Sequence, residues 1–233
     1  MPVRDAWQQA FPFDEARRAA TFLVETWKRV APAQPRNFNP RVREDKLTEL
    51  LATFVENWSV TEGHLTGQWS HEHRKAILGN DDGKIIKRIR KDITYFSNAA
   101  KVRLTLVFEF KKLRDSKDSF RAYEGGDGMR RFVDGYYAAA EPLAMMVGMV
   151  IGDRRSCVAA LRRSLMQADV RDTLCMVSTS KGDYLRDPSG MFPHLADFDT
   201  EHNRPPKQAP THGTTMLSHI FVILADEDVK RGR

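Results

Sequence analysis

The sequence has little cysteine and no long apolar run, and each absence excludes a class of protein. Only two cysteines, Cys157 and Cys175, occur in 233 residues, which argues against a disulfide-stabilised secreted domain and a cysteine metal site. We expect both to be buried thiols. No apolar run approaches the roughly 20 residues of a membrane span, and residues 1–7 lack the apolar core of a secretory signal. The sequence therefore predicts a cytoplasmic protein with no membrane partner.

Positive charge is in excess. The chain has 37 basic and 31 acidic residues, a net charge of +6 and a pI near 9.4, while its 41% apolar content is ordinary for a globular protein. The segment 84–91 alone holds five basic residues. Such a distribution favours a polyanionic partner, with DNA expected and RNA as an alternative. The residues expected to contact nucleic acid are Lys91, Lys112, Arg130 and Arg131.

The first third of the chain predicts two amphipathic helices. Apolar residues recur at helical spacing over 13–30 and again over 43–58. The proline-containing segment 31–40 separates the two helices and marks a candidate boundary. We therefore expect residues 1–35 to form an N-terminal helical extension and residues 36–233 to form the main domain. Residues 59–83 suggest a partial helix.

The remainder predicts alternating strands and helices, and hence an α/β fold with a central mixed sheet flanked by helices. Strands are expected at 84–89, 143–151, 174–178 and 220–224, and helices at 129–140 and 156–167. The run 143–151 is almost continuously apolar, which is typical of a strand buried on both faces. A long loop is expected over 181–215, and we expect the histidines in or beside it to be solvated, namely His194, His202, His212 and His219.

Residues 102–111 show the clearest strand pattern, because apolar residues alternate without a break. Glu109 and Lys111 end this strand on the same face, since side chains at i and i+2 project the same way. A second short apolar run, 93–96, follows Asp92, and the turn-prone segment 97–101 joins the two runs. If this hairpin turns near Ala100, Asp92 lies across from Glu109.

Two carboxylates held close together repel each other unless a cation lies between them. Oxygen ligands suit Mg²⁺ (or Mn²⁺), and a neighbouring lysine can orient or deprotonate an attacking water or neutralise charge on a phosphate. On the helix at 43–58, Glu44 borders the apolar stripe and is the best candidate for a third acid. The alternative is a surface hairpin in which Glu109 and Lys111 form an ordinary salt bridge.

Three segments resemble the PD-(D/E)XK nuclease superfamily, whose core is the restriction-endonuclease-like fold. They are Lys91-Asp92-Ile93, Glu109-Phe110-Lys111 at the end of an apolar strand, and the helix start Arg43 to Leu51. The resemblance covers roughly residues 41–151. At one position the chain departs from the pattern, because Lys91 stands where the family has proline.

The resemblance implies roles for these residues. Asp92 and Glu109 would be metal ligands, joined by the carbonyl of Phe110. Lys111 would activate water or stabilise charge, and Glu44 would act through a metal-bound water or a second metal. The implied activity is Mg²⁺-dependent endonucleolytic cleavage of DNA, of the kind that serves in restriction, repair or defence against foreign, including viral, DNA.

A different class of function stays open. The chain has no helix-turn-helix, zinc ribbon or basic tail that would select a target. A nuclease-like module that binds nucleic acid or protein without catalysis, as part of a larger complex, would fit this sequence as well. For either function, a partner protein or a second copy of the chain is expected to supply target recognition.

Overall fold

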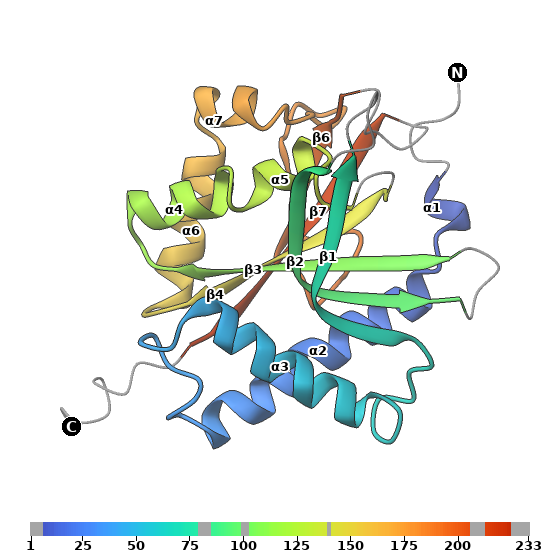
Figure 1. Cartoon of the computed structure of the whole chain (residues 1–233). Coiled ribbons are helices and arrows are strands. Elements are labelled where there is room, and N and C mark those ends of the chain that lie inside the picture. Colours follow the sequence, from blue (N-terminus) through green and yellow to red (C-terminus); the bar gives the residue numbers. More distant parts are fainter. Residues whose placement is uncertain (1–6, 79–84, 99–102, 139–140, 206–212, 225–233) are drawn as a thin grey trace.

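The computed structural model describes residues 7–78, 85–98, 103–138, 141–205 and 213–224 (Figure 1). For residues 73–78 and 85–90 it describes the backbone only. Its strands are β1 (Gln68–Leu78), β2 (Ile85–Ser97), β3 (Leu104–Leu113), β4 (Leu143–Val150), β5 (Leu185–Arg186), β6 (Phe198–Asn203) and β7 (Thr214–Ile223). Within the described residues they form one seven-stranded mixed sheet in the order β1-β2-β3-β4-β7-β6-β5. The central strands β3, β4 and β7 are parallel, and the flanking pairs are antiparallel.

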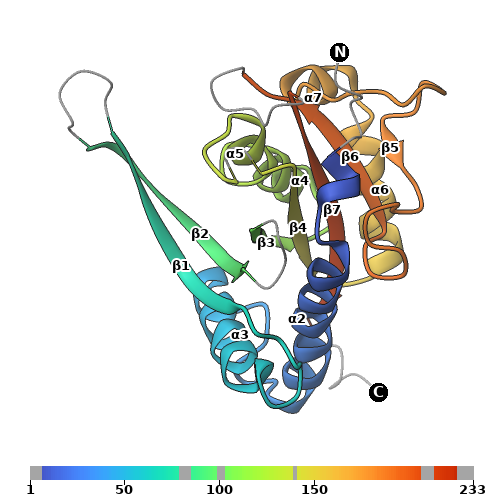
Figure 2. The ribbon, with the colours of Figure 1, turned by 90° about the vertical axis from the view of Figure 1, so that its right-hand side faces the viewer.

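Helices cover both faces of this sheet, which confirms the expected α/β class. They are α1 (Trp7–Ala10), α2 (Phe13–Ala33), α3 (Glu44–Ser59), α4 (Lys117–Glu124), α5 (Met129–Val133), α6 (Arg154–Leu165) and α7 (Ala168–Thr173). Helices α2 and α3 pack on one face, and α4, α5 and α6 pack on the other (Figure 1 and Figure 2). Each face has its own hydrophobic core, so burial of the sheet on both sides holds the layers together.

The predicted N-terminal helix is part of this main core. Helix α2 buries its apolar face in the same cluster as α3 and the sheet. The indole of Trp27 is 1% exposed, stacks edge-on against Phe38, and donates a hydrogen bond to the carbonyl of Ile223 at 2.9 Å. The expected boundary at residue 35 therefore does not coincide with a break in the core.

The predicted hairpin has the expected register. Strands β2 and β3 pair antiparallel from Ile93 opposite Phe108 to Ser97 opposite Leu104. The same register extended by one residue brings Asp92 level with Glu109. Residues 99–102 of the expected turn lie outside the described residues. Alternation along β3 together with a turn near Ala100 was thus sufficient to align the two acids.

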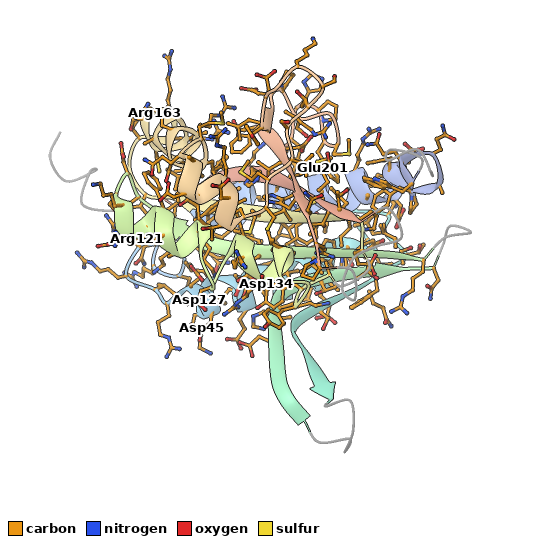
Figure 3. All side chains as sticks on the ribbon, turned by 90° about the horizontal axis from the view of Figure 1, so that it is seen from above. Asp45, Arg121, Asp127, Asp134, Arg163 and Glu201 are labelled. Carbon is orange, nitrogen blue, oxygen red and sulfur yellow. The ribbon has the colours of Figure 1, made fainter. Side chains whose placement is uncertain are left out.

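The expectation of a partial helix within residues 59–83 is wrong for the part that the structure describes, because β1 occupies residues 68–78. The turn expected at 80–83 lies outside the described residues. Trp69 pairs with Tyr95 of β2, and their rings lie 4.7 Å apart. Strand pairing overrides the helix-like spacing of the apolar residues here. Strand β2 is also one long strand and not two short ones. On the N-terminal side of Ile93, β2 pairs with β1 alone. This two-stranded ribbon projects from the layered body (Figure 2 and Figure 3).

Strand β4 confirms the expected strand buried on both faces, since all eight of its residues are buried. It lies between β3 and β7 in parallel register. Gly148 at its centre is required by close packing: a Cβ there would lie 2.6 Å from the ring of Phe221. The following Asp153 caps α6 by accepting a hydrogen bond from the backbone N–H of Ser156 at 2.7 Å.

The predicted helix at 129–140 is much shorter than expected. Helix α5 ends at Val133, where Gly135 adopts a left-handed φ of 69° that terminates it. The polar segment 114–127, between β3 and α5, contains α4. Ser116 caps this helix, which buries Phe120 and Tyr123. The short strand expected at 174–178 is reduced to one bridge between Met176 and His202.

The expected loop at 181–215 contains β5 and β6. Two of the histidines in or beside it are buried and not solvated. His202 and His219 are both 0% exposed, and the hydroxyl of Thr200 bonds to the Nε2 atoms of both, at 2.7 and 2.9 Å. His194 is exposed, whereas His212 lies outside the described residues. The last strand, β7, begins at Thr214, six residues before the expected start.

The two cysteines differ from each other. Cys157 is buried as expected, but Cys175 is exposed, and both are free thiols. Among the helices that the structure describes, none is both long enough and apolar enough to cross a membrane.

Candidate functional site

Four of the predicted site residues meet where α3 begins and where β2 and β3 part. Glu109 and Lys111 lie on β3, and Glu44 is the first residue of α3. The carboxylate of Glu44 bridges the two elements: it accepts hydrogen bonds from the Lys111 ammonium at 2.7 Å and from the backbone N–H of Lys112 at 2.9 Å. Asp92 reaches the same strand from β2. The sequence-derived constellation is therefore brought together.

Glu109 is the most unusual member of this cluster, because its side chain is fully buried. Within the described residues neither of its carboxylate oxygens has a hydrogen-bond partner. Its ion-pair partners are the Lys111 ammonium at 2.9 Å and the Arg131 guanidinium at 3.6 Å. A buried carboxylate with this environment is costly unless another group completes it.

Asp92 is fixed by the backbone of the neighbouring strand. Its Oδ2 accepts a hydrogen bond from the N–H of Phe110 at 2.9 Å. The carbonyl of Phe110, on the same residue, accepts one from the Lys111 ammonium at 2.8 Å. Phe110, predicted as a carbonyl ligand, thus has its backbone directed into the cluster.

Burial and like charge disturb the ionisation of both β-strand acids. Burial, followed by the charge of Asp92, raises the pKa of Glu109 to about 8 despite the opposing charge of Lys111. Burial also raises the pKa of Asp92, against the opposing effects of Lys111 and the Phe110 N–H. Burial lowers the pKa of Lys111, but the surrounding carboxylates outweigh it and hold this pKa above its usual range. The two β-strand acids therefore hold their protons more tightly than free carboxyl groups do, and a bound cation would offset the cost of ionising them.

Arg131 and Tyr137 complete one side of the cluster. The Arg131 guanidinium bonds to the Tyr137 hydroxyl and pairs with Asp127 at 2.6 Å, in addition to its contact with Glu109. Burial, followed by the charge of Glu109, raises the pKa of Tyr137. Sequence reasoning named Arg131 only as a nucleic-acid contact and missed the Tyr137 side chain as a member of the site. Their proximity depends on the short α5 and the turn after it, which the dipeptide Asp134-Gly135 could have signalled.

The other three predicted nucleic-acid contacts lie outside the cluster of acids. The Lys112 ammonium donates to the carbonyls of Pro40 (2.8 Å) and Val42, which holds the segment before α3 against β3. Lys91 is buried, with 7% of its surface exposed. Arg130 pairs with Asp134 at 2.8 Å. A nucleic-acid role for these three residues stays a prediction.

The residues of the cluster fit a hard divalent cation in chemistry, although they are not arranged as a preformed cage. Where side chains are described, no three His, Cys, Asp or Glu side chains form a metal-binding group. The Lys111 ammonium instead lies between Glu44 and Glu109. The oxygens of Asp92, Glu109 and the Phe110 carbonyl are nevertheless the ligand types that Mg²⁺ prefers, and both Glu109 oxygens lack a hydrogen-bond partner.

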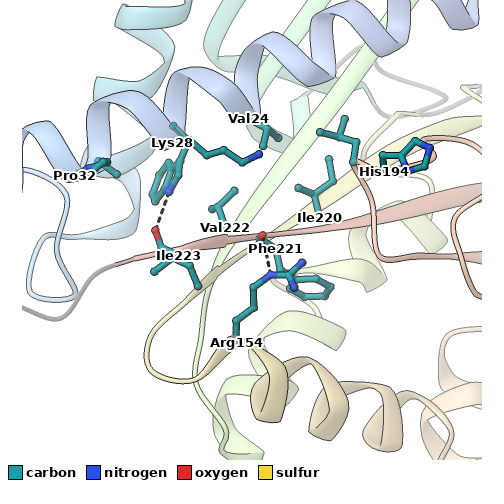
Figure 4. A pocket seen from close by; sticks show the side chains of 12 residues that line it. Val24, Lys28, Pro32, Arg154, His194, Ile220, Phe221, Val222 and Ile223 are labelled. Atoms are coloured by element: carbon teal, nitrogen blue, oxygen red, sulfur yellow. Dashed lines mark hydrogen bonds between the residues drawn. The ribbon is translucent and has the colours of Figure 1, made fainter. Parts of the chain in front are cut away.

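A separate cleft of about 500 Å³ lies between α2 and the end of β7 (Figure 4). Its lining is mainly apolar, and the carbonyls of Phe221 and Ile223 at its floor accept hydrogen bonds from Arg154 (3.4 Å) and Trp27 (2.9 Å). None of the acids of the cluster lines it.

Comparison of the chain with protein-family models, curated proteins and solved structures finds no match. The proposal below therefore rests on the residues and their geometry.

Proposed function

We propose that this protein is a Mg²⁺-dependent nuclease that hydrolyses phosphodiester bonds in DNA and has a core of the restriction-endonuclease-like, PD-(D/E)XK type. The observation that carries the proposal is the buried Glu109. Its oxygens accept no hydrogen bond within the described structure, while Asp92, Lys111 and Glu44 converge on it from three separate elements. Mn²⁺ could replace Mg²⁺ in such an oxygen site.

The chain's own residues would divide the work as follows. Asp92, Glu109 and the Phe110 carbonyl would hold the cation, which when bound polarises the scissile phosphate and lowers the pKa of a bound water. Lys111 has a pKa above its usual range, so it would stay protonated and stabilise negative charge developing on the phosphate. Glu44 positions this ammonium through its hydrogen bond of 2.7 Å.

Arg131 supports a phosphate-containing substrate. Its guanidinium lies 3.6 Å from Glu109 and is held in place by Tyr137 and Asp127. A guanidinium fixed beside the reacting centre can bind the planar oxygens of a phosphate in a bidentate manner. The net charge of +6 favours a polyanion over a small neutral substrate.

A binding module without catalysis is the second candidate, and one observation favours it. The Lys111 ammonium already neutralises part of the charge of Glu44 and Glu109. A cluster that is balanced in this way can be a structural ion-pair network. The two candidates differ in whether Lys111 and the acids are needed for turnover.

Cleavage of supercoiled plasmid DNA in Mg²⁺ tests the proposal. We expect Asp92→Asn, Glu109→Gln and Lys111→Met each to reduce the rate by about 10³-fold, since each removes a charge acting at the reacting phosphate. Matched controls lie on the exposed part of α3: Glu49→Gln and Lys46→Met should cleave at the wild-type rate. A parallel assay on RNA tests the choice of nucleic acid.

Two results would overturn the proposal. One is equal cleavage by the wild type and all three site variants in preparations that lose activity with EDTA, which would indicate a contaminating nuclease. The other is DNA binding by the wild type with no cleavage in Mg²⁺ or Mn²⁺, which would favour the binding module.

A further inference from the structure

The projecting part of the β1–β2 ribbon, residues 73–78 and 85–90, is here called the arm. Its two strands pair with each other from His73 opposite Lys91 to Leu78 opposite Ile85, and the pairing of β2 with β3 begins only at Ile93. At about 3.4 Å per residue, the paired part of β1 in the arm spans roughly 17 Å. The arm projects from the layered body in two views (Figure 2 and Figure 3).

The register sorts the basic residues of the arm onto two faces. Directly opposite residues of an antiparallel pair share a face, and neighbours along a strand alternate. Arg74 opposite Arg90 and Ala76 opposite Arg88 therefore place three arginines on one face. The pairs Lys75 with Ile89 and Ile77 with Lys87 place lysines on the other face. Both faces of the arm thus carry basic residues, and residues 73–78 and 85–90 contain no aspartate or glutamate.

This arrangement disfavours the arm in isolation. Like charges at directly opposite positions of a ladder are destabilising, and the register pairs position 74 with position 90 and position 76 with position 88, where three of the four residues are arginines. A two-stranded ribbon without a third strand has little other support. An anionic ligand lying along the arginine face would offset this repulsion.

The arm begins beside the cluster of acids. Between the pairs His71–Ile93 and His73–Lys91 the ladder is interrupted at Glu72 and Asp92. Glu72 has a left-handed φ of 51° there, which is uncommon for a residue with a side chain. The strand that supplies Asp92 to the cluster therefore continues directly into the arm, and a polymer bound along the arm would pass the cluster.

We infer that the arm binds the phosphate backbone of duplex DNA and guides it toward Asp92 and Glu109. This inference rests on the proposed function for the direction of the substrate. A duplex is favoured because a two-stranded ribbon fits the major groove, about 12 Å wide, with phosphates on both sides of it. Arginine is the residue best suited to bind those phosphates.

Fluorescence anisotropy with a labelled duplex in EDTA, where no metal-dependent cleavage occurs, tests the inference. The triple variant Arg74→Gln, Arg88→Gln, Arg90→Gln should bind at least about tenfold more weakly and lower the slope of log K against log[KCl] by about 2–3, because three phosphate contacts are lost. The control Arg18→Gln, Lys28→Gln, Arg36→Gln changes the net charge equally at exposed positions and should bind as the wild type does.

A second variant separates charge from folding. Replacing the same three arginines with lysine keeps the charges and should retain the wild-type salt slope. The inference is overturned if the glutamine variant binds like the wild type, if the control loses as much affinity, or if the wild type prefers duplex RNA. Plasmid cleavage distinguishes the two proposals. If the wild type cleaves DNA but the glutamine variant binds DNA equally well, only the inference about the arm is refuted. If the wild type binds DNA through the arm but does not cleave it, only the proposed nuclease activity is refuted.

Discussion

Two acids, Asp199 on β6 and Glu109 on β3, are both completely buried in the same sheet, yet their surroundings differ. Asp199 accepts four hydrogen bonds: the hydroxyls of Ser189 and Ser218 bond to Oδ1, both at 2.7 Å, and the backbone N–H groups of Gly190 and Met191 bond to Oδ2 at 2.8 and 3.2 Å. Glu109 accepts none within the described structure. The comparison separates an acid that completes the fold from one that the fold leaves incomplete.

The pKa values reflect this difference. Burial raises the pKa of Asp199, but all four of its hydrogen-bond donors act against that rise. For Glu109 the burial and the charge of Asp92 act together, and only the cations of Lys111 and Arg131 oppose them. A buried carboxylate that is held by two cations and by no backbone or hydroxyl donor is expected where a ligand, such as a metal ion, supplies further interactions.

Matched amide substitutions give the first expected difference between the two acids. Asp199→Asn turns one acceptor of a satisfied set into a donor, and we expect it to lower the free energy of unfolding by about 3 kcal/mol. Glu109→Gln replaces a buried carboxyl that a pKa of about 8 keeps largely protonated at neutral pH. It loses the 2.9 Å contact with Lys111, which keeps its partner Glu44. It should leave stability unchanged or raise it. Urea denaturation of both variants, without divalent metal, measures this.

The contrast would be broken if Glu109→Gln destabilised the protein as much as Asp199→Asn does. Glu109 would then be a structural ion-pair partner, and the reason to assign it a ligand would disappear.

The pH dependence of stability gives a second difference between the two acids. Because the pKa of Glu109 rises from 4.5 to about 8 on folding, the folded protein holds a proton that the unfolded chain releases. The stability that this group contributes is present below pH 4.5 and is lost as pH rises toward 8. Wild type should therefore lose about 4 kcal/mol relative to Glu109→Gln across this range. Other groups, such as the buried histidines, act equally in both proteins and cancel.

Thermal unfolding of both proteins at a series of pH values, in EDTA, gives the required difference. Parallel pH profiles would mean that Glu109 ionises in the folded protein as it does in the unfolded chain.

The two sites also differ in how far the sequence predicts them. Glu109 and Lys111 were found because β3 alternates cleanly, and Asp92 was found because a hairpin turn near Ala100 would place it opposite Glu109. Glu44 was found because it borders the apolar stripe of α3. These signals are local, and each needs only one element and its immediate partner.

Strand β6 was missed for the opposite reason. Its sequence Phe-Asp-Thr-Glu-His-Asn reads as a polar loop, but Asp199, Thr200, Glu201 and His202 are all buried with polar partners. Hydrophobic periodicity has no signal where polar groups satisfy one another across a sheet. The place of Arg131 and Tyr137 beside Glu109 was also not predicted, because a helix was expected to run through Asp134-Gly135, where the left-handed Gly135 instead turns the chain.

The most direct test of the central claim is diffraction from crystals soaked in Mn²⁺, recorded for the wild type and for Glu109→Gln. We predict an anomalous peak in contact with Asp92, Glu109 and the Phe110 carbonyl in the wild type, with the Lys111 ammonium displaced from Glu109, and no peak in the variant. A saturating soak that leaves the wild-type site without a peak and Lys111 in its place beside Glu109 would contradict the account.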